Sequence, residues 1–103
     1  MDDIAKRIQK IMEENHVPVF GMAPSHALEN APSGNRPTET LNDAKSVFCM
    51  GIPMPRGLFQ CGSRSLPAYW RAAAVTYRQM DWILLEVARA VEEDGGSAVP
   101  LYG

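Results

Sequence analysis

The stretch Ser46-Val-Phe-Cys-Met-Gly-Ile52 is a continuous apolar run that leads into a loop rich in proline and glycine, Pro53-Met-Pro-Arg-Gly-Leu-Phe-Gln-Cys-Gly-Ser-Arg-Ser65. After this loop, apolar side chains recur with helical spacing from Leu66 to Glu93. The apolar run is typical of a strand buried on both faces, and the periodic segment predicts a helix of about 28 residues. Ligand sites often lie where a strand ends in such a loop, so residues 52–65 are the first candidate for ligand contact.

Length and composition place the chain in a narrow class. Its 103 residues are enough for a single domain, residues 1–103, with one modest hydrophobic core. A net charge of −2 gives no general attraction to nucleic acid. No apolar run approaches the ~20 residues of a membrane-spanning helix, and the acidic N-terminus is unlike a secretory signal. The two cysteines lack the spacing of a disulfide scaffold or a metal site. We therefore expect a cytoplasmic protein that holds no metal.

A first helix is expected over residues 2–14. Ile4, Ile8 and Ile11 fall on one helical face, as in a helix that packs on a core. Asn15 is expected to end this helix in the left-handed conformation that commonly terminates helices.

Three short strands are expected, at residues 17–23, 46–52 and 97–102. The second and third flank the long helix, and a strand–helix–strand crossover favours a parallel pair. The polar segment 25–42 is expected to be mostly loop, with one helical turn near residues 26–30 and with Leu41 in the core. The expected fold class is α/β, with α+β left open: a small three-stranded sheet packed by two helices, the second about 28 residues long.

One side of the long helix is continuously apolar. Eight side chains alternate in steps of four and three residues: Leu66, Trp70, Ala73, Tyr77, Met80, Leu84, Val87 and Val91. This period predicts a stripe that faces the core. Ser65 is a good N-cap for the helix, and Gly95 is expected to end it.

The same helix is also apolar on a second side, where Val75, Trp82, Ile83 and Leu85 lie. A helix that is apolar on most sides is normally buried in a larger protein. One short helix and three short strands can cover one side of it but not two. We therefore expect these four residues to form an interface with something outside the chain's own core: a second copy, another subunit, or a C-terminal part of the same polypeptide.

An edge of the long helix carries arginines. Arg64, Arg71 and Arg78 recur every seven residues, and Arg56 lies in the preceding loop. Such a row could hold a phosphate or the backbone of a nucleic acid such as tRNA. The simpler alternative is a solvated helix edge, and the net charge does not favour a strong nucleic-acid binder.

Other reactive side chains give weaker signals. Cys61 lies in the flexible loop near arginines that would favour its thiolate, but no histidine is close in sequence to act as a base. Cys49, inside the apolar run, is expected to be a small core residue. His16 and His26 lack further ligands at metal-binding spacing. We predict no catalytic residue in this chain, and Cys61 with the arginines is the candidate ligand contact.

Several segments in order resemble one known family. They are Phe20-Gly-Met-Ala-Pro24, Asp43-Ala-Lys-Ser-Val-Phe-Cys-Met-Gly-Ile-Pro53, the long helix, and Glu93-Asp-Gly-Gly-Ser-Ala-Val-Pro100. Together they resemble the N-terminal region of epoxyqueuosine-reductase-like iron–sulfur proteins, which are relatives of the corrinoid-dependent reductive dehalogenases. The resemblance covers most of the chain and is weakest over residues 25–42.

The chain also departs from that family. The family's iron–sulfur domain carries clustered cysteines, which this sequence lacks, and its cobalamin-binding segment lies beyond Gly103. The resemblance therefore implies a truncated, non-catalytic N-terminal module of an oxidoreductase. It would contribute scaffold and part of a substrate or cofactor pocket, with cobalamin and iron–sulfur clusters held by the rest of the enzyme and no cofactor held by this chain alone. The alternative is a small self-associating α/β module, such as a homodimer, with no ligand.

Overall fold

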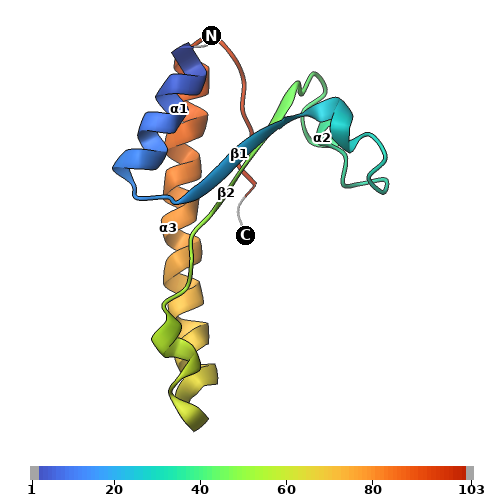
Figure 1. Ribbon diagram of the computed structural model, residues 1–103. Helices are drawn as coiled ribbons and strands as arrows, with labels where there is room; N and C mark the ends of the chain where they lie inside the picture. Colours follow the sequence, from blue (N-terminus) through green and yellow to red (C-terminus); the bar gives the residue numbers. More distant parts are fainter. Residues whose placement is uncertain (1–2, 102–103) are drawn as a thin grey trace.

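Two helices form the core of the protein, whose computed structural model describes residues 3–101 (Figure 1). Helix α1 (Asp3–Glu14) packs against the second half of helix α3 (Ser65–Glu93). The buried cluster consists of Ile8, Ile11, Met12, Val17, Ile83, Val87 and Ala90. Met12 is fully buried at its centre. The first helix expected at residues 2–14 is thus confirmed, although residue 2 lies outside the described residues.

Helix α1 ends at Glu14, as expected, but the left-handed residue that follows it is not the expected one. His16, not Asn15, adopts the left-handed conformation, with φ of 58°. The amide of Val17 then donates to the carbonyl of Met12 at 2.9 Å, which closes the helix end and places Val17 in the core. Asn15 instead caps from its side chain, because its amide nitrogen donates to the carbonyl of Ile11 at 2.8 Å.

The sheet has two strands, not the three that were expected. Strand β1 (Val19–Pro24) pairs antiparallel with β2 (Ser46–Gly51), in a register that sets Phe20 opposite Met50. The described part of the third segment, residues 97–101, forms no strand, and Tyr102 lies outside the described residues. Pro100 in this segment cannot donate a ladder hydrogen bond. The expected parallel pair is therefore wrong, and among the described residues the ribbon is paired along neither outer edge.

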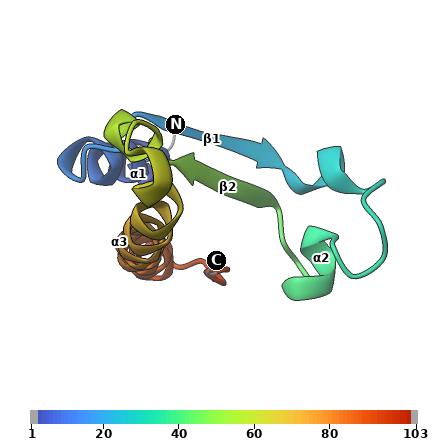
Figure 2. The same ribbon diagram turned by 90° about the horizontal axis from the view of Figure 1, so that it is seen from below.

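Only one face of the ribbon is covered. Phe48 and Met50 pack against the helical core, while Cys49 points to the other face and is exposed. The expectation that residues 46–52 are buried on both faces is wrong, and so is the expectation that Cys49 is a core residue. Helices α1 and α3 lie together at one end of the two strands (Figure 2), so most of the ribbon projects away from them.

The far end of the ribbon carries a small lobe made by residues 25–45. It contains a 3₁₀ turn (Ser25–Leu28), close to the helical turn expected there, and a short helix α2 (Pro37–Thr40) that the sequence did not predict. Leu41 is half-buried in this lobe and is not part of the helical core. The carboxylate of Glu39 organises the lobe by accepting from the backbone amides of Gly34, at 2.9 Å, and Arg36, at 3.0 Å.

Two 3₁₀ turns, Arg56–Phe59 and Gly62–Arg64, connect β2 to α3. Ser65 is the first residue of α3 and not its N-cap, and its hydroxyl accepts from the amide of Cys61 at 3.2 Å. The helix runs for 29 residues, close to the expected length. Gly95 ends it with φ of 96°, as expected.

The molecule is extended for its size. Its radius of gyration is 16.0 Å, whereas a compact domain of this length has about 13 Å. Two parts protrude from the core: the ribbon with its lobe, and the first half of α3 (Figures 1 and 2). The core therefore occupies one end of α3 and leaves the other end supported only by the connecting loop.

Met12 tests the position of the core. Replacing Met12 by Ala should lower the free energy of unfolding by about 2–5 kcal/mol, because it opens a cavity between the helices. The matched variant Met22→Ala, on the exposed strand β1, should change it by less than about 0.5 kcal/mol. Urea unfolding followed by circular dichroism measures both, and equal effects would contradict this core.

Glu39 tests the order of the lobe. The amides of Gly34 and then Arg36 hold the pKa of the Glu39 carboxyl below its ordinary value of 4.5. Because the folded-state pKa is lowered, the stabilisation is present above the ordinary value and is lost as pH falls through the folded-state pKa. A carbon-13 NMR titration should therefore give a low midpoint for Glu39, and amide exchange at residues 33–36 should accelerate in the same acidic range. In Glu39→Gln the lobe should exchange quickly at every pH, and an unchanged exchange rate would contradict this role.

Candidate functional site

The first half of α3 carries large apolar side chains that remain half or more exposed. Leu66 and Trp70 are each 67% exposed, and Tyr77 is 50% exposed. All three belong to the stripe that was expected to face the core, and for them that expectation is wrong. Farther along the same stripe, Val87 is buried and Leu84 is half-buried, as expected.

The lengths of the two helices explain this division. Helix α1 has 12 residues and is about 18 Å long. Helix α3 has 29 residues and is about 44 Å long. Side chains of α3 that lie beyond the reach of α1 therefore remain in solvent unless another surface covers them.

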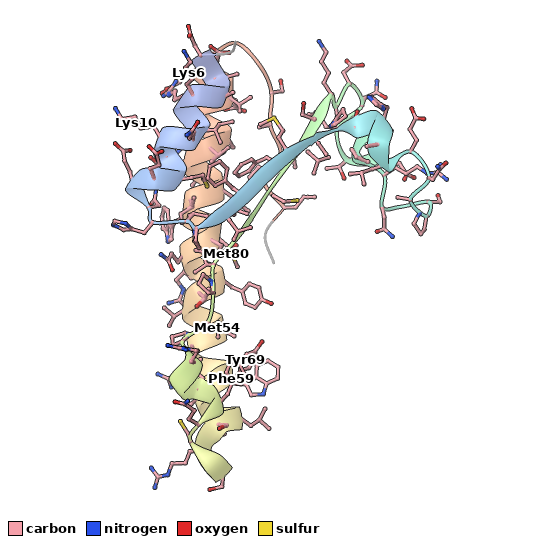
Figure 3. All side chains as sticks on the ribbon, viewed as in Figure 1. Lys6, Lys10, Met54, Phe59, Tyr69 and Met80 are labelled. Carbon is pink, nitrogen blue, oxygen red and sulfur yellow. The ribbon has the colours of Figure 1, made fainter. Side chains whose placement is uncertain are left out.

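The connecting loop covers a narrow part of this first half. The ring of Phe59 lies 5.9 Å from the ring of Tyr69, and Met54 lies on the same stretch of the helix (Figure 3). Phe59 is nevertheless 66% exposed. It extends the exposed apolar surface of Leu66, Trp70 and Tyr77, which we call the Trp70 surface, with these four residues as its members.

The predicted interface residues divide into two groups. Val75 and Trp82 are 62% and 66% exposed, and Leu85 is half-buried. Ile83 is 3% exposed and lies in the core against α1. It is therefore unavailable to a partner, and its assignment to the interface is wrong: helical spacing places Ile83 about 100° around the helix from Trp82, on the side that α1 covers.

The predicted ligand contacts are all exposed but are not gathered into a cavity. Arg71 and Arg78 lie on one edge of α3, Arg64 ends the 3₁₀ turn just before the helix, and Arg56 lies in the first 3₁₀ turn. None of the four forms an ion pair with another described residue. Cys61 is exposed, and its thiol donates to the carbonyl of Gly57 at 3.0 Å, within its own loop.

Two shallow hollows lie beside α3: one of about 530 Å³ in the groove between α1 and α3, and one of about 430 Å³ between α3 and Asn15, just past the end of α1. Glu86 and Arg89 line both, and Trp82 lines the second. No predicted ligand contact lines either hollow. The first is ringed by three cationic and three anionic side chains: Arg7, Lys10, Arg89, Glu14, Glu86 and Glu93. This balance gives no preference for a ligand of one charge.

Two side-chain contacts bridge α3 and the α1 region along this groove. Arg7 forms an ion pair with Glu93, and the side-chain amide of Asn15 donates to Glu86 at 3.2 Å. Both pairs are exposed, so each contributes little to stability. Their main effect is to orient the two carboxylates of α3 beside the groove.

Residues 3–101 contain neither a cluster of metal ligands nor a helix that could span a membrane. No group of three or more histidine, cysteine, aspartate or glutamate side chains in this part of the chain is placed to hold a metal ion. His16 and His26 are both exposed, on different elements. No helix within the described range combines the length and the apolar character needed to cross a bilayer.

Comparison with known proteins gives no relative from which a function could be transferred. No protein-family model, no curated protein and no solved structure matches the chain. The exposed apolar sides of α3 are thus the features on which a functional argument can be built. Sequence reasoning found the Val75–Trp82 side and missed the Trp70 surface, although the excess length of the second helix over the first already signalled it.

The two cysteines test which faces are open. Both thiols should react with 5,5′-dithiobis(2-nitrobenzoic acid) in the native protein without denaturant, because Cys49 and Cys61 are exposed. Cys49→Ser should lower the number of reactive thiols from two to one. If Cys49 reacted only after addition of urea, its face of the ribbon would be covered in solution.

Proposed function

We propose that this chain is a non-catalytic scaffold module that is completed by packing against another polypeptide surface. The observation that carries the proposal is the exposed area of 7672 Å². A compact monomer of the same mass exposes about 5,800 Å². The surplus of about 1,900 Å² is in the range that one partner contributes to a large, permanent interface.

The Trp70 surface and the ribbon are exposed parts that a partner could cover. A contiguous apolar patch of this kind usually marks a contact with another protein. A two-stranded ribbon is marginally stable alone, and an open strand edge can accept a further strand from a partner. A partner surface that covers the first half of α3 and adds a strand to the ribbon would bury the apolar patch and pair the open strand edge.

The resemblance described above supplies a candidate for that surface. The partner surface would belong to the iron–sulfur and corrinoid portion of an epoxyqueuosine-reductase-like oxidoreductase in the cytoplasm. That portion would hold the cobalamin and the iron–sulfur clusters. The loop at residues 52–65 would then border a substrate or cofactor pocket that the other portion completes. The support from this chain is that the loop lies beside the uncovered half of α3.

A second candidate function is self-association without a ligand. It is favoured by Val75 and Trp82, which are exposed on a different side of α3 from the Trp70 surface.

The scaffold proposal predicts that the Trp70 surface adds nothing to the stability of the isolated chain. Trp70→Ser should change the free energy of unfolding by less than about 0.5 kcal/mol, because the side chain is exposed. It should also reduce binding of the apolar dye 8-anilinonaphthalene-1-sulfonate. The control Val87→Ala, in the core, should destabilise the chain and leave native-state dye binding in place. A large loss of stability in Trp70→Ser would mean that the surface is already covered within the chain.

The family assignment needs a separate measurement. The native polypeptide that contains these residues, produced in cells supplied with iron and cobalamin, should show the visible absorption bands of both cofactors. A colourless protein would remove the oxidoreductase assignment and leave the scaffold proposal to be judged by the Trp70 variant.

A further inference from the structure

The Val75–Trp82 side of α3 is separate from the Trp70 surface. Twelve residues separate Trp82 from Trp70, which places the two indoles about 120° apart around the helix. Val75 and Trp82 are seven residues apart and so lie on one side, two turns from each other. A partner on this side therefore leaves the Trp70 surface open.

Charges are segregated along this same side. Arg71 and Arg78 lie in the first half of α3 and Arg64 immediately precedes the helix, whereas Glu86 and Glu93 lie in its second half. All five lie within about 60° of Trp82 around the helix. Arg89 is an exception to the segregation, since it lies among the carboxylates.

We propose that this side binds the same side of a second copy of the chain, with the two α3 helices antiparallel. A parallel pair would set arginine against arginine and glutamate against glutamate. An antiparallel pair sets the basic half of each helix against the acidic half of the other. Complementary charge of this kind selects orientation and register in protein association.

The sequence positions define one register. Three pairs share the same midpoint, between residues 78 and 79: Arg64 with Glu93, Arg71 with Glu86, and Val75 with Trp82. A two-fold axis through that midpoint brings the members of each pair together across the interface, and each pairing occurs twice, as two-fold symmetry requires. Arg78 of each copy then lies next to the axis without a carboxylate opposite it, the apolar pair lies beside it, and the two ion pairs lie outside.

The carboxylates have capacity for these contacts. Within one chain, Glu86 accepts from Asn15 through Oε1, and Glu93 pairs with Arg7 through Oε1. Each carboxylate has a second oxygen that can accept from an arginine of the other copy. The intrachain bonds hold the two carboxylates in place for a partner.

The shape of the groove and the exposed area agree with this arrangement. The first half of the partner's α3 would lie over the hollows beside α3, which Trp82, Glu86, Arg89 and Glu93 line. A stable interface of standard size buries about 800 Å² on each partner. The surplus exposed area of about 1,900 Å² is enough for this pairing together with a contact at the Trp70 surface.

Sedimentation equilibrium with charge-reversal variants tests the pairing. The unmodified chain should dimerise, and Arg71→Glu should weaken the dimer because it sets glutamate opposite Glu86. The double variant Arg71→Glu/Glu86→Arg should restore dimerisation, because it reverses both members of the pair. Trp82→Ala should raise the dimer dissociation constant roughly 30-fold, as for a central interface tryptophan. Lys6→Glu, on the outer side of α1, is the matched control and should leave the dimer intact.

Cross-linking tests the register. Residue 79 lies next to the proposed axis. In a Cys49→Ser/Cys61→Ser background, the variant Gln79→Cys should therefore form a covalent dimer with a short bis-maleimide. Tyr77→Cys, on the Trp70 surface, should not. Cross-linking through Tyr77→Cys alone, a failure of the double charge reversal to restore the dimer, or a monomer at all soluble concentrations would each overturn the proposal. Because these variants leave Trp70 unchanged, their failure does not affect the test of the scaffold function.

Discussion

The contact between α1 and the second half of α3 is the interaction on which the rest of the structure depends. It buries Met12 together with isoleucine, valine and alanine side chains from both helices, and Phe48 and Met50 of the ribbon attach to it. In a chain this short, the burial of apolar surface barely exceeds the conformational entropy lost on folding. The ribbon and the first half of α3 have few contacts outside this core. Their order therefore depends on how firmly the two helices hold together.

This dependence explains why the molecule has two exposed apolar sides. Helix α1 is too short to cover all of α3, and the ribbon turns away from the uncovered half (Figure 1). Isolated exposed apolar residues are ordinary in soluble proteins, but two largely exposed tryptophans on one helix, each with other exposed apolar side chains on its side, are not. The two sides are about 120° apart, so they can be occupied by different partners. A scaffold role and a pairing of like chains are thus compatible in one molecule.

Local features were predictable because their causes lie close together in the sequence. The spacing of Ile4, Ile8 and Ile11 indicated α1, the continuous apolar run indicated β2, and Gly95 indicated the end of α3. The errors about burial share one cause, which is that apolar character was taken to mean burial. Cys49 and Trp70 are as apolar as core residues, yet they are exposed because no element lies over them.

The sequence by itself determined the two main helices, the two strands and the apolar and charged edges of α3, since each follows from side-chain periodicity within one segment. Only the tertiary structure decided which of those edges the chain covers itself. The packing of α1 placed Ile83 in the core and left Val75 and Trp82 in solvent, although all three are apolar residues of the same helix. The physical reason is geometric: the 12 residues of α1 can shield one side of one half of α3, and the sequence does not state which.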